Sequence, residues 1–269
     1  MPKVRLDVLL VEKGLADSRA KAQALIMAGQ VRVAHQVVLK PATAIQPDSL
    51  LTVDMGPRYV SRGGEKLEGA LTAFAIDVKD FVCVDVGSST GGFTDCLLQH
   101  GAKKVYAIDV GKGILHWKLR NDSRVVVMEE TNARFVESLP EPIDFVTVDA
   151  SFISLKVLLP VIKKWKVEGN IVALIKPQFE AGRRDVSKGD GVIRNPEIHK
   201  QVLKDVLSFA QSEGFGLKGL VKSSLLGPKG NVEFLLWMDL KPNDILVEDL
   251  VSHVMNQEIA SDEETLSSQ

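Results

Sequence analysis

The hydrophobic pattern of the chain begins with two short amphipathic segments. Apolar side chains three and four positions apart predict a helix over residues 5–13 and a second over residues 18–28. Two short alternating runs within residues 30–40, and a further one at residues 50–53, predict a small sheet. Residues 1–56 are therefore expected to form a small α+β domain.

A different pattern follows a linker expected at residues 57–60, where proline and glycine interrupt the preceding strand. From residue 61 onward, apolar runs alternate with segments of helical spacing. The expected strands are residues 81–85, 104–109, 124–129, 144–149, 170–176, 217–223 and 232–240. The last two flank a Gly-Pro-Lys-Gly turn, which suits an antiparallel hairpin.

This order of elements predicts an α/β fold over residues 61–243. It is a Rossmann-like, doubly wound sheet of seven strands in which the last strand is reversed. The arrangement is the usual architecture of class I S-adenosylmethionine-dependent methyltransferases. Dehydrogenases normally lack the final hairpin.

Charge is distributed unevenly along the chain. The formal net charge is −2, but residues 244–269 contain seven acidic residues and no Lys or Arg, so the remainder carries +5. These last residues are predicted to form an acidic C-terminal tail. Residues 1–66 contain ten Lys or Arg against six Asp or Glu, an excess that permits nucleic-acid binding without requiring it.

The composition indicates a globular, cytoplasmic protein. No window approaches the ~20 apolar residues of a membrane-spanning helix, and the first residues lack the apolar core of a signal peptide. Cys83 and Cys96 are expected to be small core residues, because their spacing fits neither a disulfide framework nor a zinc site. No metal site is predicted, and the oligomeric state is left open.

A glycine-rich turn after the first long apolar strand marks the expected ligand site. A dinucleotide-binding turn has a second glycine where the backbone approaches a pyrophosphate, but this chain has Ser89 there. Gly87, Gly91 and Gly92 keep the turn tight. A nucleoside ligand without phosphates, such as S-adenosylmethionine, therefore fits better. A purely structural turn is the alternative.

Polar residues near the carboxyl ends of the first three strands are candidates for contacts with this cofactor. Asp109 lies 22 positions after Gly87, where an acidic side chain commonly accepts hydrogen bonds from both ribose hydroxyls of an adenosine ligand; a helix cap is the alternative. Asp85 is expected either to orient the turn or to meet the amino-acid moiety of the ligand through water. Asn132 is expected near the adenine.

The ends of the later strands favour chemistry on a hydroxyl. Asp149 is followed by Ala-Ser-Phe and lacks the Pro-Pro pair with which many methyltransferases hold an exocyclic amine. Lys176 ends a buried apolar strand, so its cation needs a carboxylate partner or a neutral form. Glu233 opens the last strand. A ribose hydroxyl is a very weak acid, so a base or charge stabilisation must be supplied.

Three motifs near the N-terminus carry a first resemblance. They are Arg5-Leu-Asp-x-x-Leu10, Gly14-Leu-x-x-Ser-Arg-x-x-Ala22, and Gly29-x-Val-x-Val33 followed by Lys40-Pro41. Residues 3–54 thereby resemble the alpha-L RNA-binding domain that a small-subunit ribosomal protein shares with several pseudouridine synthases. The resemblance implies RNA binding, and the candidate contacts are Arg5, Arg19, Lys21, Arg32 and Lys40. An ordinary solvated surface is the alternative.

Five further motifs span nearly the whole chain. They are Ser61-Arg-Gly-Gly-Glu-Lys66, Gly87-Ser-Ser-Thr-Gly-Gly-Phe-Thr94, Asp149-Ala-Ser-Phe-Ile-Ser154, Lys176-Pro-Gln-Phe-Glu180 and Gly230-Asn-Val-Glu-Phe234. Together they resemble the TlyA, or hemolysin A, family, whose catalytic half is similar to FtsJ-type ribose methyltransferases. FtsJ-type enzymes use a Lys-Asp-Lys-Glu tetrad, and the matching residues are Lys66, Asp149, Lys176 and Glu233.

This resemblance implies an enzyme that uses S-adenosylmethionine to methylate the 2′ oxygen of cytidine in ribosomal RNA. The large ribosomal subunit is the favoured partner, because the chain starts close to its first helix, as in the shorter members. Lys176 is expected to be the base, with Lys66 nearby, Asp149 orienting it, and Glu233 fixing Lys66 or the ribose.

Two other functions remain as alternatives. Methylation of a base nitrogen in RNA is the nearest enzymatic one. A membrane-lysing activity is suggested only by the name hemolysin. The glycine-rich, cationic loop at residues 180–191 is expected to be either a mobile lip over the RNA or an ordinary loop.

Overall fold

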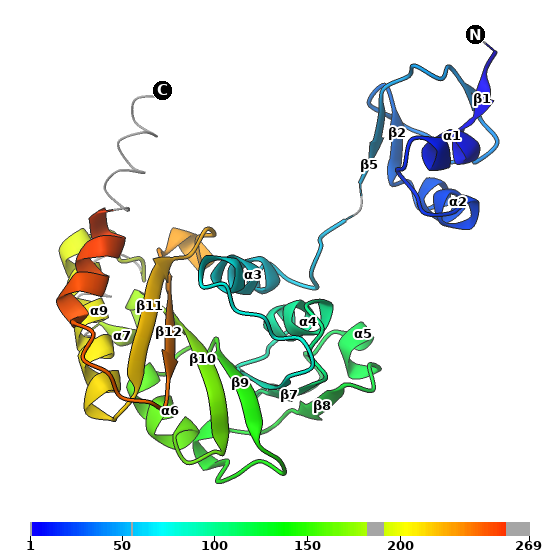
Figure 1. Ribbon diagram of the computed structural model, residues 1–269. Coiled ribbons are helices and arrows are strands. Elements are labelled where there is room, and N and C mark those ends of the chain that lie inside the picture. Colours follow the sequence, from blue (N-terminus) through cyan, green and yellow to red (C-terminus); the bar gives the residue numbers. More distant parts are fainter. Residues whose placement is uncertain (1, 55, 182–190, 257–269) are drawn as a thin grey trace. The chain divides into compact units, whose positions relative to one another are not determined.

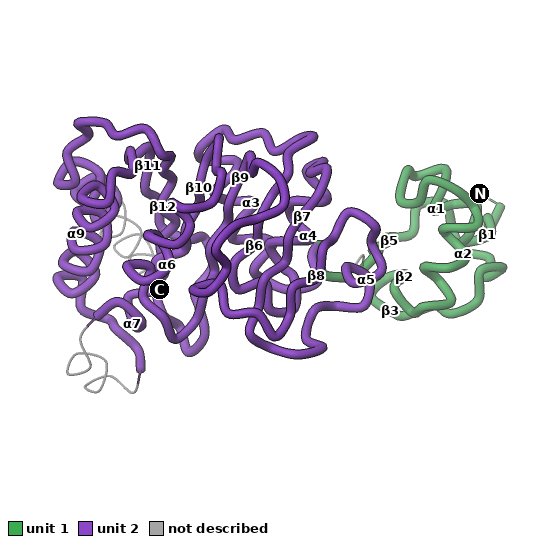
Figure 2. Tube along the Cα trace, turned by 90° about the horizontal axis from the view of Figure 1, so that it is seen from below, with its two compact units in different colours: residues 1–58 green, residues 59–269 purple. Residues whose placement is uncertain are grey.

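The computed structural model describes residues 2–54, 56–181 and 191–256. Most of the expected lip and the last part of the expected acidic tail lie outside these residues. The chain divides into two compact units, Met1–Arg58 and Tyr59–Gln269 (Figure 2). Tyr59 was assigned to the predicted linker, but it is buried in the core of the second unit because its ring packs against Gly64.

The first unit contains two helices and short strands. The elements are β1 (Val4–Arg5), α1 (Leu6–Glu12), α2 (Arg19–Met27), β2 (Val31–Val33), β3 (Gln36–Val37), β4 (Ala44–Ile45) and β5 (Leu51–Val53). Strands β3, β2 and β5 form an antiparallel sheet, and β1 pairs with β4. Ser18 caps α2 by accepting a hydrogen bond from the Lys21 amide at 3.2 Å. The two helices enclose a small core with Val31 and Ile45.

The second unit alternates strands and helices. Its first half contains α3 (Gly63–Ala73), β6 (Val82–Val86), α4 (Gly92–Gln99), β7 (Lys104–Ile108), α5 (Trp117–Arg120), β8 (Val125–Met128) and η1 (Ala133–Phe135). The rest contains β9 (Ile143–Val148), α6 (Leu155–Ile162), β10 (Val167–Ile175), α7 (Pro177–Glu180), α9 (Pro196–Ser212), β11 (Gly216–Lys222), η2 (Pro228–Gly230) and β12 (Phe234–Asp239).

These strands form one seven-stranded sheet in the order β11-β12-β10-β9-β6-β7-β8 (Figure 1). The pairs from β10 to β8 are parallel, and β12 runs antiparallel to both of its neighbours. The predicted α/β sheet with a reversed last strand is thus confirmed. The parallel order brings the carboxyl ends of β6, β7, β9 and β10 to one edge, where ligands bind in such sheets.

Helices cover both faces of this sheet with separate apolar cores. Leu67 of α3 and Leu97 of α4 pack on one face, whereas Leu159 of α6 and Leu203 of α9 pack on the other. Both cysteines are buried core residues, as predicted. None of the helices in the described ranges is long and apolar enough to cross a membrane.

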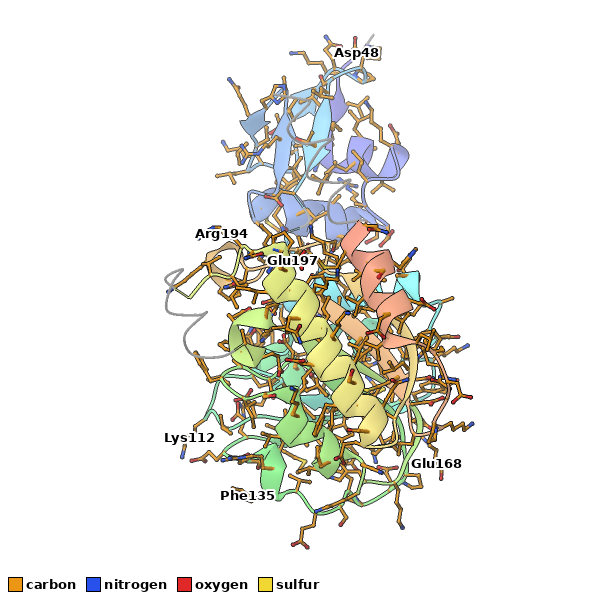
Figure 3. All side chains as sticks on the ribbon, turned by 90° about the vertical axis from the view of Figure 1, so that its left-hand side faces the viewer. Asp48, Lys112, Phe135, Glu168, Arg194 and Glu197 are labelled. Carbon is orange, nitrogen blue, oxygen red and sulfur yellow. The ribbon has the colours of Figure 1, made fainter. Side chains whose placement is uncertain are left out.

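The chain after β12 differs from the predicted tail. Residues 247–256 are helical, and this helix lies beside α9 (Figure 3). Val247, Val251 and Val254 are buried in the core that α9 also covers. The prediction of a tail relied on the acidic side chains and overlooked an apolar stripe whose members lie three and four residues apart. Residues 257–269 lie outside the described part.

Candidate active site

The turn between β6 and α4 is shaped by close contacts that only glycine allows. Gly87 has φ +81°, and a Cβ atom there would lie 2.7 Å from the carbonyl oxygen of Asp149. A Cβ atom on Gly91, which has φ +98°, would lie 2.2 Å from a methyl group of Leu119. Gly87 thus lets the ends of β6 and β9 lie close together. Gly91 lets the start of α4 pack against Leu119 of α5.

Asp85 is fully buried behind this turn. One of its carboxylate oxygens accepts hydrogen bonds from the amide and the hydroxyl of Thr94, at 2.9 and 2.7 Å, and the other accepts one from the Thr147 hydroxyl at 3.1 Å. Burial raises the pKa of Asp85 to about 7, against the opposing effect of the Thr94 hydrogen bonds. Asp85 and Gly91 line neither of the two cavities described below, and their assignment to the cofactor stays a prediction.

A cavity of about 460 Å³ opens on the other side of the turn, where the cofactor was expected. Gly87, Ser89, Asp109 and Asn132 line it, together with the segment 149–153 that follows β9. Asp109 accepts hydrogen bonds from the Ser89 amide at 2.8 Å and the Gly111 amide at 2.7 Å. This carboxylate therefore fixes the turn and still faces the cavity.

Glu129 organises the rim beside this cavity, and the sequence analysis did not identify it. Its carboxylate accepts hydrogen bonds from the amides of Gly113, Ile114 and Leu115 at 2.7–3.0 Å, and it pairs with Arg120 at 2.6 Å. The Arg120 guanidinium, with these amides, lowers the pKa of Glu129 to about 2. The loop after β7 is thereby held against the end of β8.

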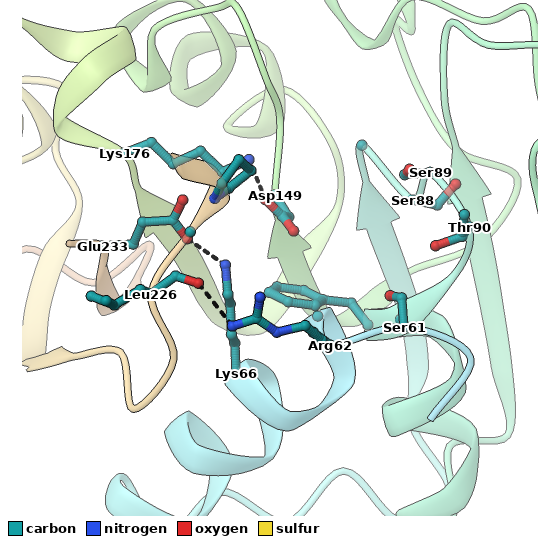
Figure 4. Close-up of a pocket in the computed structure, with 16 residues that line it drawn as sticks. Ser61, Arg62, Lys66, Ser88, Ser89, Thr90, Asp149, Lys176, Leu226 and Glu233 are labelled. Carbon is teal, nitrogen blue, oxygen red and sulfur yellow. Dashed lines mark hydrogen bonds and ion pairs between the residues drawn. The ribbon is translucent and has the colours of Figure 1, made fainter. Parts of the chain in front are cut away.

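A second cavity, of about 500 Å³, contains the four residues of the expected tetrad. Lys66 comes from α3, Asp149 and Lys176 directly follow β9 and β10, and Glu233 directly precedes β12 (Figure 4). Gly87, Ser89 and Asp149 line this cavity as well as the first. The two cavities therefore meet beside Asp149.

The tetrad consists of two ion pairs. Lys66 Nζ lies 2.5 Å from Glu233 Oε2, and Lys176 Nζ lies 2.6 Å from Asp149 Oδ1 (Figure 4). Lys176 also donates a hydrogen bond to the Ser151 hydroxyl at 3.0 Å. Both lysines and Glu233 are buried. Burying so many charges is tolerable because each cation has an anionic partner, which leaves the cluster neutral.

Small residues allow close packing of α3 against α4 and of the segment before η2 against Glu233. A Cβ atom on Gly92 would lie 2.2 Å from the Ser61 hydroxyl oxygen and 2.9 Å from the Gly64 amide. A Cβ atom on Gly227 would lie 2.0 Å from Glu233 Oε1. Gly92 lines the second cavity and lies at the contact between α3 and α4, and its predicted contact with the cofactor stays a prediction.

No role was predicted for three further residues near the site, Phe152, Phe179 and Glu180, although the quoted motifs contain them. Phe152 has φ +63°, is 90% exposed and lines the cofactor cavity, with its ring 4.9 Å from that of Phe179. Glu180 accepts hydrogen bonds from the Ser154 hydroxyl at 2.5 Å and the Leu155 amide at 2.7 Å. These contacts tie the segment after Lys176 to the segment after Asp149. A strained backbone and a contact between distant segments leave no local signal in a sequence.

The five candidate RNA contacts all lie exposed on the first unit. Two of them, Arg5 and Arg19, are joined to the buried carboxylate of Asp7. Lys21 lies in the first turn of α2, Arg32 lies on β2, and Lys40 follows β3. Their assignment to RNA binding stays a prediction.

Comparison with known proteins agrees with this geometry. Residues 59–240 match the model of the FtsJ-like methyltransferase family, and residues 4–51 match that of the S4 domain. The chain belongs to the FtsJ-like methyltransferase family. The prediction of a methyltransferase is thereby confirmed.

Two named relatives and one solved structure are similar to this chain over most of their length. A Bacillus subtilis protein named as a candidate rRNA methyltransferase is 54% identical over 87% of this chain and 85% of its own. The Mycobacterium tuberculosis protein named 16S/23S rRNA (cytidine-2′-O)-methyltransferase TlyA is 44% identical over 95% of this chain and 98% of its own. A solved structure from Streptococcus thermophilus, described as a candidate hemolysin, is 43% identical, covers 98% and 99% of the two chains, and superposes with a TM-score of 0.70.

Proposed function

We propose that the protein methylates the 2′ oxygen of cytidine in ribosomal RNA, with S-adenosylmethionine as the methyl donor. The observation that carries this proposal is the meeting of two cavities beside Asp149, one suited to a nucleoside and the other lined by two Lys-carboxylate pairs. The family supports methyl transfer, and the name of the M. tuberculosis relative supports the class of substrate. Ribosomal RNA as substrate leads us to expect the protein in the cytoplasm.

The first cavity has the size and polarity to hold the cofactor. Its volume of about 460 Å³ is in the usual range for small-molecule sites. Each carboxylate oxygen has two acceptor positions, so Asp109 retains one on each oxygen after its two backbone contacts and suits a pair of ribose hydroxyls. Ile114 and Phe152 supply apolar surface for an adenine ring. When bound, S-adenosylmethionine supplies a methyl group that its sulfonium charge already activates.

The second cavity suits the acceptor ribose. Once its amine has released its own proton, Lys176 takes up the proton of the 2′ hydroxyl, and Asp149 with Ser151 fixes this amine. Lys66 places a positive charge near the oxygen that becomes negative, and Glu233 holds this ammonium in position. The absence of a Pro-Pro pair after Asp149 disfavours an exocyclic amine as the acceptor.

The first unit is assigned the binding of RNA. Five exposed cations supply phosphate contacts, and the match to the S4 domain supports this division of labour. Phosphate contacts release counterions, so binding should weaken steeply as salt increases.

Alkaline hydrolysis of the methylated RNA tests the position of the methyl group. Cleavage of RNA by alkali needs a free 2′ oxygen, so radiolabelled methyl groups should remain in resistant dinucleotides. Label recovered in mononucleotides would assign the reaction to a base. Mapping the modified nucleotide in both 16S and 23S RNA then decides whether cytidine is the target and whether the large subunit is the favoured partner.

A further inference from the structure

Asp7, in the first turn of α1, is a fully buried carboxylate that the proposed function leaves without a role. Arg5 donates to both of its oxygens, from Nε and an Nη atom, at 3.0 Å each. Arg19 Nε donates at 2.9 Å, and the Gln23 amide donates at 2.8 Å. The Arg5 guanidinium, with smaller contributions from Gln23 and Arg19, holds the pKa of Asp7 well below its usual range.

Both arginines keep a large exposed surface while they bind Asp7. Their side chains are 46% and 55% exposed, whereas the Asp7 side chain is inaccessible. A guanidinium has five N–H donors, of which Arg5 uses two on Asp7 and Arg19 uses one. The buried Asp7 carboxylate thus fixes both planar guanidinium groups, and their remaining N–H donors face solvent.

We propose that Asp7 is a positioning residue for RNA binding, which holds the guanidinium groups of Arg5 and Arg19 as a rigid pair for backbone phosphates. The inference rests on the proposed RNA-binding role of the first unit. A side chain that is already fixed loses little conformational freedom on binding, so its phosphate contact retains more of its free energy. A buried acid therefore strengthens the binding of a polyanion.

This inference predicts an effect with the opposite sign to that of simple charge. Asp7→Asn removes a negative charge from the RNA-binding unit, and charge alone would then raise the affinity. We expect the affinity for 23S rRNA to fall about three- to tenfold instead, as for the partial loss of charge-assisted contacts. The matched control is Asp17→Asn, which removes an exposed carboxylate two positions from Arg19 and should maintain or raise the affinity.

The test uses the full-length protein and purified 23S rRNA over a range of salt concentrations. The Asp7→Asn variant should also show a smaller salt dependence, since each lost phosphate contact lowers the log–log slope by about 0.7–0.9. If this variant does not fold, as judged by circular dichroism, Gln23→Ala is used instead. It removes one donor to Asp7, and a smaller loss of affinity in the same direction is expected.

A double-mutant cycle with Arg19→Gln separates positioning from a general effect on folding. Arg19→Gln should cost much less RNA affinity in the Asp7→Asn background than in the native background. An equal cost in the two backgrounds overturns the inference and leaves the proposed function intact. If Arg19→Gln has no effect in the native background, the inference is wrong, while Arg5, Lys21, Arg32 and Lys40 still carry the proposed RNA-binding role of the first unit and the methylation assay still judges the catalytic proposal.

Discussion

Replacement of Lys176 by methionine should abolish most methyl transfer while cofactor binding remains. Methionine retains much of the buried aliphatic volume but removes the amine that contacts Asp149 at 2.6 Å and Ser151 at 3.0 Å. Loss of a proton acceptor typically lowers turnover by about 10²–10⁴. At about 1.4 kcal/mol for each factor of ten, this corresponds to roughly 3–6 kcal/mol of transition-state stabilisation.

The cost in folding stability should be smaller than the cost in catalysis. Asp149 loses its cationic partner, but its side chain is 23% exposed and can regain water. We therefore expect the free energy of unfolding to fall by about 1–3 kcal/mol, below the cost of leaving a fully buried charge unpaired. Lys176 lines the second cavity and not the cofactor cavity, so the dissociation constant for S-adenosylmethionine should change little.

Calorimetry with the cofactor and single-turnover transfer of labelled methyl groups to ribosomal RNA measure these two quantities separately. Lys164→Met, which removes an exposed lysine from the turn just after α6, is the matched control and should be fully active. Lys176→Arg should be nearly as inactive as Lys176→Met, because a guanidinium keeps its charge but does not accept a proton. An active arginine variant would refute the assignment of Lys176 as the base, as would cofactor affinity that falls in step with turnover.

Three further changes test the rest of the site. Asp109→Ala should weaken S-adenosylmethionine binding at least about tenfold, because the ribose and two backbone amides lose an acceptor; unchanged affinity by calorimetry would contradict the assignment. Asp85 has a pKa raised to about 7 by burial, so its ionisation should lower the free energy of unfolding as pH rises from about 4 through about 7. Asp85→Asn should remove this part of the pH dependence, which urea denaturation at pH 5 and pH 8 measures. If the native protein and the variant lost the same free energy of unfolding between these pH values, ionisation of Asp85 would not be the cause. Glu180→Ala should lower turnover and cost about 1–3 kcal/mol of stability, and Glu180→Gln, which retains an acceptor for Ser154, should restore most of both.

The sequence by itself determined the elements and their order in the second unit. Long apolar runs with turns between them predict strands well, because a parallel strand is buried on both faces. The strand ends therefore identified Asp109, Asp149 and Lys176 as facing one edge of the sheet. The Gly-Pro-Lys-Gly turn likewise predicted the hairpin of β11 and β12, because turn residues encode local backbone geometry.

Only the tertiary structure decided which contacts these residues make. Asp85 accepts two hydrogen bonds from Thr94, and Gly91 packs against Leu119, and the sequence motif shows neither contact. The pairing of Lys66 with Glu233 joins residues 167 positions apart. Such contacts depend on close packing between distant segments, which Gly92 allows between α3 and α4 and Gly227 allows beside Glu233.

The same limit applies at the C-terminus and in the first unit. Residues 247–256 contain Glu248 and Asp249 and no Lys or Arg, but Val251 and Val254 become core residues because the sheet leaves an apolar surface beside α9 for them to cover. In the sequence, Asp7 is an ordinary acidic residue in the first turn of a helix. Nothing in the sequence indicates that Arg5 and Arg19 both form ion pairs with it. Local patterns determine which segments become helices and strands, whereas the partners of a buried charge are decided by packing between segments.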